Sequence, residues 1–156
     1  MTIQTRRGNL IALAIEGYFD VIVQGCNCFH TMGGGLARQI REQFPAAYQA
    51  DLATPRGDRA KLGTYSFARY EREPDRLPLT IVNGYTQFSF GGGLQVDYEA
   101  VDRLMQRVAV DFDGHRIGLP MIGAGLAGGD WPTLRAIIDK RLGEQDCTIV
   151  EFDPSA

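Results

Sequence analysis

One stretch, residues 21–40, constrains the fold more than any other part of this chain of 156 residues. Its sequence, VIVQGCNCFHTMGGGLARQI, begins with an apolar run of the kind found in strands that are buried on both faces. Three consecutive glycines follow, and then Leu36, Ile40 and Phe44 recur at four-residue spacing, which places them on one face of a helix. The stretch therefore predicts a buried strand, a glycine-rich loop and a helix in direct succession.

A loop of this kind is suited to binding phosphate. The first N–H groups of a helix have no partner within the helix, and the helix dipole makes that end positive. Glycine has no Cβ, so phosphate oxygens can approach the backbone closely. Two further glycine-rich segments, residues 85–93 (YTQFSFGGG) and 121–129 (MIGAGLAGG), also follow predicted strands. Sheets of this class bind ligands at the carboxyl ends of their strands, so we expect the three loops to surround one cleft.

Strands and helices alternate along the rest of the chain, which favours an α/β fold with a mainly parallel sheet. We predict a three-layer α/β/α sandwich with a mixed, mainly parallel sheet and one antiparallel hairpin near its edge. Residues 1–156 are expected to form a single domain. The expected strands are residues 3–6, 21–23, 62–70, 79–83, 116–119 and 147–152, and the expected helices begin near residues 9, 35, 46, 96 and 130.

Composition excludes several classes of protein. A formal charge of −3 and a pI near 5.3 give no basic footprint, so no direct binding to a nucleic-acid backbone is expected. No apolar run approaches the roughly 18 residues of a membrane span, and residues 1–9 lack the hydrophobic segment of a signal peptide. Three cysteines are too few for a disulfide framework. We therefore expect a cytoplasmic protein, without a membrane partner, that acts on small molecules or proteins.

The third glycine-rich segment contains a GxGxxG pattern at residues 123–128, GAGLAG, between a predicted strand and a predicted helix. That context formally satisfies the fingerprint of a dinucleotide-binding domain. Such a domain needs several strand and helix units after its fingerprint, whereas one helix and one strand remain here. A nicotinamide-binding site and a plain structural turn are therefore the alternatives to a phosphate loop of another kind.

Together these motifs resemble those of macro domains, the ADP-ribose-binding fold. The resemblance rests on Asn27 with the MGGGLA run of residues 32–37, and on the loop IGAGLAGGDW of residues 122–131. It extends to RGNL at residues 7–10, which is similar to the family's first turn, with Asn9 in place of the usual acidic residue. An amide can both donate and accept hydrogen bonds, so Asn9 remains suited to adenine.

The resemblance implies that the third loop wraps a diphosphate and the distal ribose, and that Asn27 meets a ribose hydroxyl. Alternatively, Asn27 bonds to backbone groups of its own loop. Tyr85 and Phe90 would stack on or shield the ribose and adenine, or else belong to the core. The expected ligand-binding residues are Asn9, Leu10, Asn27, Gly33, Gly34, Gly35, Leu36, Tyr85, Phe90, Gly123, Ala124, Gly125, Leu126, Ala127 and Gly128.

A metal site is the alternative for Cys26, Cys28 and His30, which are zinc ligands by type. Their spacing argues against it, because paired zinc ligands usually have two to four residues between them, whereas one residue separates each of these, and no second cluster completes a tetrahedron. Cys147 stands alone at the far end of the chain. Cysteines that are buried or that line the loop are the simpler interpretation, so we expect neither a metal nor a cofactor.

The resemblance also implies a function: binding of ADP-ribose or a derivative, free or attached to a macromolecule. The expected activity is hydrolysis of ADP-ribose 1''-phosphate or removal of ADP-ribose from a modified target. The alternative is a non-catalytic reader of ADP-ribosylated protein or nucleic acid. The branch that looks closest contains a yeast phosphatase for ADP-ribose 1''-phosphate, whose loop histidine aligns near Gln24. Two other branches each have an acidic residue in these loops. Here Ala37 stands at the position of one, and Ala127 lies near the position of the other.

His30 and Asp130 are the predicted catalytic residues, because both are expected on loops at the carboxyl end of the sheet. A neutral imidazole can activate water near pH 7, and a carboxylate can orient the water or receive a proton. The alternative for His30 is an exposed loop residue. The alternative for Asp130, which precedes a Trp-Pro pair, is a helix N-cap.

Overall fold

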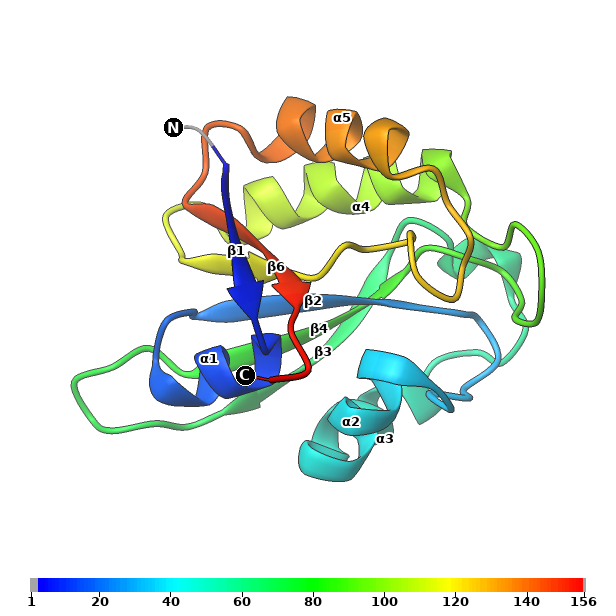
Figure 1. Ribbon diagram of the computed structural model, residues 1–156. Coiled ribbons are helices and arrows are strands. Elements are labelled where there is room, and N and C mark those ends of the chain that lie inside the picture. The colour runs from blue at the N-terminus through cyan, green and yellow to red at the C-terminus, as the bar shows by residue number, and fades with distance from the viewer. Residues whose placement is uncertain (1–2, 156) are drawn as a thin grey trace.

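The computed structural model describes residues 3–155, and one six-stranded sheet forms its centre (Figure 1). The strands are β1 (Gln4–Gly8), β2 (Val21–Cys26), β3 (Tyr65–Tyr70), β4 (Leu79–Tyr85), β5 (Ile117–Leu119) and β6 (Cys147–Phe152). Their order across the sheet is β1-β6-β5-β2-β4-β3. Neighbouring strands are parallel except for β3 and β4, which form an antiparallel hairpin at one edge. The predicted mixed, mainly parallel sheet with an edge hairpin is confirmed.

Helices cover both faces of the sheet (Figure 1). They are α1 (Leu10–Glu16), α2 (Gly35–Gln43), α3 (Pro45–Leu52), α4 (Tyr98–Asp111) and α5 (Trp131–Leu142), with a short 3-10 helix, η1 (Arg59–Lys61). Helices α4 and α5 lie on one side of the sheet, and α1, α2 and α3 lie on the other. The predicted three-layer sandwich is therefore confirmed. Within the described residues, no helix has the length and apolar character needed to cross a membrane.

The apolar run in β2 explains why this strand lies between two helical layers. Successive strand residues point to opposite faces of a sheet. Val21 and Val23 belong to the core beneath α4 and α5, together with Leu104, whereas Ile22 belongs to the opposite core with Ile40. A strand that is covered on both faces therefore needs apolar residues at consecutive positions, as the sequence has.

Several predicted element boundaries differ from the observed ones by one to three residues, and two of them differ for a clear local reason. The hairpin strand, expected from Leu62, begins at Tyr65, because Gly63 turns the chain with a φ of 82°. The helix expected from residue 96 begins two residues later as α4. The side chain of Asp97 caps this helix by accepting a hydrogen bond from the N–H of Ala100 at 3.0 Å. A capping residue thus sets the start of α4 more sharply than its apolar periodicity does.

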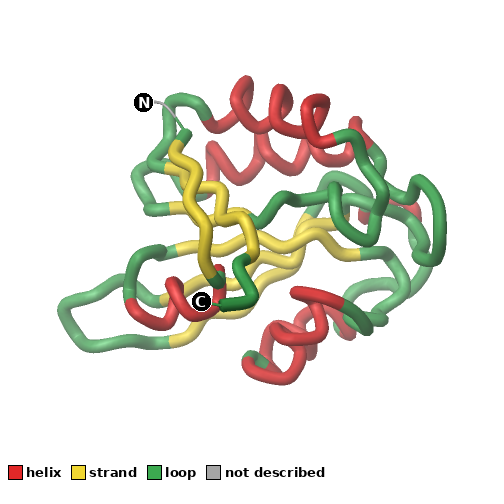
Figure 2. The backbone as a smooth tube through the Cα atoms, viewed as in Figure 1, coloured by secondary structure: helices red, strands yellow, loops and turns green. Residues whose placement is uncertain are grey.

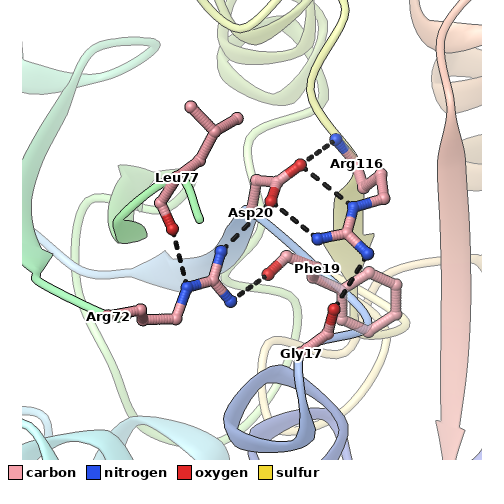
Figure 3. Close-up of polar contacts among 6 residues, drawn as sticks. All are labelled: Gly17, Phe19, Asp20, Arg72, Leu77 and Arg116. Carbon is pink, nitrogen blue, oxygen red and sulfur yellow. Dashed lines mark hydrogen bonds and ion pairs between the residues drawn. The ribbon is translucent and has the colours of Figure 1, made fainter. Parts of the chain in front are cut away.

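At the end of the sheet where β2 and β5 begin, two arginines clamp the buried carboxylate of Asp20 (Figure 3). Arg116 donates to Asp20 through its backbone N–H at 3.0 Å and through Nε and Nη2 at 3.1 and 2.8 Å. Arg72, from the hairpin, donates through Nη2 at 3.1 Å. Burial by itself raises the carboxyl pKa, but the hydrogen bonds and charge of Arg116, with the charge of Arg72, hold the pKa of Asp20 at about 2. The clamp ties the starts of β2 and β5 to the hairpin.

Candidate functional site

The three glycine-rich loops gather beyond the carboxyl ends of β2, β4 and β5, at the right-hand end of Figure 2. They surround a cavity of about 510 Å³ and an adjoining cavity of about 270 Å³, here called the larger and the smaller cavity. The two cavities share part of their walls and so form one cleft. The shared residues are Gly25, Gly34, Ala37, Gln87 and Leu126.

Most residues that the sequence analysis assigned to ligand binding line this cleft. Asn27, Gly33, Gly34, Phe90 and Leu126 line the larger cavity, and Gly34, Gly35, Leu36, Gly123, Gly125, Leu126 and Ala127 line the smaller one. The expected gathering of the three loops around one cleft is thus observed. That these residues contact a ligand stays a prediction.

Five of the assigned residues line neither cavity: Asn9, Leu10, Tyr85, Ala124 and Gly128. Asn9 caps α1 by accepting a hydrogen bond from the N–H of Ala12 at 3.0 Å, and Leu10 is buried in the core. Ala124 packs against the core beneath α4 and α5. A ligand contact for these five residues stays a prediction.

Hydrogen bonds join the second and third loops to each other. The carbonyl of Ala127 accepts from the N–H groups of Gln95 and Val96 at 2.8 and 3.2 Å. Gly128 has a φ of 71° and packs so closely that a Cβ there would lie 2.8 Å from the carbonyl oxygen of Gly93. Glycine is required at this contact because a side chain would separate the two loops.

The first turn of α2 offers free backbone donors to the cleft. No side chain caps this helix at Gly34, so its first N–H groups keep no partner within the helix. Opposite them, a Cβ on Gly34 would lie 3.0 Å from Cδ1 of Leu126. The N–H groups of Gly125 and Leu126 form no hydrogen bond to any residue between 3 and 155. None of the cleft-lining residues in that range is Lys or Arg, so backbone N–H groups and the start of α2 are the groups on these walls that attract an anion.

Asp130 caps α5 and lines neither cavity. Its Oδ2 accepts hydrogen bonds from the hydroxyl and the backbone N–H of Thr133 at 2.6 and 3.1 Å. These two hydrogen bonds lower the pKa of Asp130, whose carboxylate is exposed. The geometry agrees with the N-cap alternative, and a catalytic role for Asp130 stays a prediction.

His30 also lies outside the walls of both cavities. Its Nε2 is 3.2 Å from Oγ1 of Thr54, and its carbonyl accepts a hydrogen bond from the hydroxyl of Tyr48 at 3.3 Å. With a φ of 63°, its backbone adopts a left-handed conformation that turns the loop toward α3. The structure therefore does not bring the predicted pair, His30 and Asp130, together on the cleft wall.

A carboxylate that the sequence analysis missed, Asp51 of α3, lies on the wall of the larger cavity although it is only 1% exposed. The hydroxyl of Tyr85 donates to Oδ1 of Asp51 at 2.7 Å and lies 2.8 Å from the hydroxyl of Ser66. Burial is the main cause that raises the pKa of Tyr85, so its hydroxyl keeps its proton. Tyr85 is a core residue that holds Asp51, which agrees with the core alternative given for it. The sequence does contain one signal for this residue. Asp51 lies one helical turn after Ala47, so it places a charge on the apolar side of α3.

Two buried polar atoms on the wall of the smaller cavity have no hydrogen-bond partner among the described residues: Oε1 of Gln24 and Oγ1 of Thr86. Gln24 Nε2 donates to Oδ1 of Asn83 at 2.9 Å, which fixes the amide and leaves Oε1 unpaired. Unpaired buried polar groups are costly, so these two oxygens mark the part of this wall where hydrogen bonding is incomplete. Gln24 occupies the position that the resemblance gives to a histidine, and an amide cannot act as a base there.

Asn27 bonds within its own loop and lines the larger cavity as well. Its Oδ1 accepts from the N–H of Phe29 at 2.8 Å, and its Nδ2 donates to the hydroxyl of Thr31 at 2.6 Å. The nearby cysteines, Cys26 and Cys28, are buried free thiols whose pKa values are raised chiefly by burial. Across residues 3–155, no three His, Cys, Asp or Glu side chains are placed to hold a metal ion.

A mixed six-stranded sheet between two helical layers, with a cleft of glycine-rich loops at the strand ends, is the arrangement found in macro domains. No protein family model matches the chain. It is 36% identical over 160 residues to the "uncharacterized 17.5 kDa protein in tk-vs intergenic region" of Enterobacteria phage T4, and the match covers 99% of each chain. It is 29% identical over 138 residues to the DNA ADP-ribosyl glycohydrolase of Thermus aquaticus, a match that covers 87% of this chain and 36% of that relative.

Solved structures agree with this class. The macrodomain of Thermus aquaticus DarG superposes with a TM-score of 0.73 and 26% identity, over 98% of this chain and 99% of that one. Thermosipho africanus DarTG in complex with ADP-ribose superposes with a TM-score of 0.68 over 90% of this chain and 39% of that one, and its 15% identity shows a shared fold alone. The fold of the chain is that of macro domains, and the likeness to the DarG macrodomain supports a place in that family.

Proposed function

We propose that this macro domain binds ADP-ribose in its cleft and hydrolyses the bond between C1'' of the distal ribose and an attached group. The observation that carries the proposal is the set of free backbone donors on two sides of the cleft, at the uncapped start of α2 and at Gly125 and Leu126. A diphosphate suits such a site, because each phosphate can meet its own group of N–H donors without a cationic side chain.

In the proposed complex, the diphosphate crosses the shared wall between Gly34 and Leu126. The distal ribose occupies the larger cavity beside Asn27, and the adenosine leaves through the smaller cavity. Each cavity is small, and together they fall within the roughly 300–1,000 Å³ of typical small-molecule sites. The adenosine would then pass beside Gln24 and Thr86, which line the smaller cavity.

Hydrolysis is proposed in preference to a non-catalytic reader because one relative is named a DNA ADP-ribosyl glycohydrolase. The attached group is then part of a macromolecule, and the phosphate of ADP-ribose 1''-phosphate is the second candidate. We also propose that residues 1–156 act as one domain in the cytoplasm, where the free thiols of Cys26, Cys28 and Cys147 would persist.

Calorimetric titration with ADP-ribose tests the binding. We expect a dissociation constant in the micromolar range, equivalent to about −8 kcal/mol, and much weaker binding of AMP and NAD. If millimolar ADP-ribose produced no heat of binding and no shift in melting temperature, the proposal would be contradicted.

Turnover is tested on three substrates: an ADP-ribosylated oligodeoxynucleotide, an ADP-ribosylated protein and ADP-ribose 1''-phosphate. Release of ADP-ribose is followed for the first two substrates and release of phosphate for the third. We expect hydrolysis of at least one. Binding of ADP-ribose without turnover of any substrate would favour the reader.

A further inference from the structure

Asp51 is the one carboxylate among the described residues that line the cleft, and the proposed binding scheme gives it no task. It is 1% exposed, and burying a carboxylate is costly unless a partner compensates for the lost water. No ion pair joins Asp51 to another described residue. Such an arrangement is uncommon where a residue serves packing alone.

One oxygen of the Asp51 carboxylate is fixed and the other is free. Oδ1 accepts the hydrogen bond from the hydroxyl of Tyr85 at 2.7 Å, and the hydroxyl of Ser66 holds Tyr85 in turn. Oδ2 accepts no hydrogen bond from any residue in the described range. The carboxylate is therefore held in one orientation by one oxygen, while the second oxygen remains available to a molecule in the larger cavity.

A buried cation lies close to this carboxylate without bonding to it. Lys61 is 6% exposed, and its Nζ lies 4.5 Å from the centre of the Tyr85 ring and 3.3 Å from the carbonyl oxygen of Cys28. Burial and then Asp51 raise the pKa of Cys26, while Lys61 lowers it, so both charges act on the same wall of the cavity. Lys61 thus offsets the charge of Asp51 and leaves its oxygens unoccupied.

We propose that Asp51 is the general base of the hydrolysis, a role that rests on the proposed function of the cleft. Oδ2 takes a proton from the water that attacks C1'' of the distal ribose. A bond forms between the water oxygen and C1'', and the bond from C1'' to the attached group breaks, with its electron pair leaving on that group. The proton on Asp51 then passes to the leaving group, so the products are ADP-ribose and the protonated leaving group.

Tyr85 is a positioning residue in this scheme, because it touches Asp51 and does not line the cavity. Its hydroxyl fixes Oδ1 and so directs Oδ2 to one place. Loss of that hydroxyl should lower kcat and leave the affinity for ADP-ribose unchanged, since no binding group moves. A purely structural role would instead lower stability without this separation of kcat from affinity.

The Asp51→Asn variant tests the base directly. Asparagine retains an oxygen that accepts from Tyr85 but cannot take a proton from water. On the substrate that the parent hydrolyses, we expect kcat to fall by about 10²–10⁴-fold, with the dissociation constant for ADP-ribose within about threefold of the parent value. The matched control is Glu42→Gln, which removes an exposed carboxylate of α2 that pairs with Arg38 and should keep the parent kcat.

Each result decides between the two proposals. A folded Asp51→Asn protein that turns over at the parent rate overturns the role of Asp51 and leaves the proposed function intact. A parent protein that binds ADP-ribose but hydrolyses none of the three substrates overturns both the hydrolysis and the base. Should Asp51→Asn fail to fold, Tyr85→Phe decides the matter, with an expected loss in kcat of about tenfold or more. An unchanged kcat in that variant overturns the proposal.

Discussion

Gly125 is the position where a single added side chain would most directly obstruct the proposed diphosphate site. No atom lies within 4 Å of a Cβ built there, and its φ lies outside the left-handed region, so another residue fits without strain. The carboxylate of Gly125→Glu would occupy the space of a phosphate and repel its charge. We expect affinity for ADP-ribose to fall at least about a hundredfold by calorimetry, with an unchanged melting temperature.

The control for this variant is Val110→Glu, which adds the same charge on α4, where Val110 is 72% exposed. That protein should bind ADP-ribose like the parent. If a folded Gly125→Glu protein kept the parent affinity, the diphosphate would have to bind elsewhere.

Individual cleft residues differ in how far the sequence predicts them. The glycines at 33–35 were predictable, because their place between a strand and a helix is a local pattern. Asp51 was not, since its partner Tyr85 lies 34 residues away along the chain and meets it only when α3 packs on the sheet. Tyr85 itself fits a core or a ligand role equally well by residue type, and only its burial in the folded chain favours the core role.

Among the helices, α5 allows a test of whether Asp130 only caps the helix or also takes part in the hydrolysis. Asp130→Ala removes the acceptor for Thr133 and should lower the melting temperature by a few degrees, whereas Asp130→Asn keeps a capping oxygen and should melt close to the parent. Both variants should hydrolyse substrate at the parent rate, because Asp130 lies outside the cleft walls. A large fall in kcat for a stable Asp130→Asn protein would show that Asp130 takes part in the hydrolysis.

The order and type of the elements were predictable because apolar periodicity differs between helices and strands. The residues at which elements begin and end were harder to predict. Apolar spacing carries on through a boundary, whereas a cap such as Asp97 or a turn such as that at Gly63 ends it within a residue or two.

For the molecule as a whole, the Asp20 clamp links stability to pH. Asp20→Ala leaves two arginines without their shared partner and should cost about 3–5 kcal/mol of unfolding free energy at pH 7. The folded pKa of about 2 is below the unfolded value of about 3.9, so the clamp stabilises fully above about pH 4. Its contribution falls as the pH drops from about 4 toward 2.

Denaturant unfolding of the parent and of Asp20→Ala at a series of pH values measures this contribution. The difference between the two proteins should narrow below pH 4. Asp139→Ala is the control, because its pair with Arg135 is exposed and should contribute less than about 0.5 kcal/mol. A difference for Asp20→Ala that stays constant down to pH 2 would show that the clamp does not titrate as described.

The sheet order could not be predicted from the sequence, although the fold class could. Alternating strands and helices imply a covered parallel sheet, but periodicity tells which face a residue occupies and not which strand lies beside it. β1 pairs with β6, so Gln4 lies opposite Thr148, and only the assembled molecule brings these ends of the chain together.

The bonds from Gln95 and Val96 to the carbonyl of Ala127 have a consequence for local opening of the structure. Amides exchange with deuterium when their hydrogen bonds break, and these two cannot open unless the third loop moves as well. ADP-ribose held at residues 125–126 should therefore slow exchange at Gln95 and Val96, measured by mass spectrometry or NMR, while the hairpin amide of Arg76 exchanges as before. If exchange at Gln95 and Val96 did not change when ADP-ribose binds, the two loops would open separately. Otherwise, a ligand held at residues 125–126 stiffens two amides, those of Gln95 and Val96, that line neither cavity.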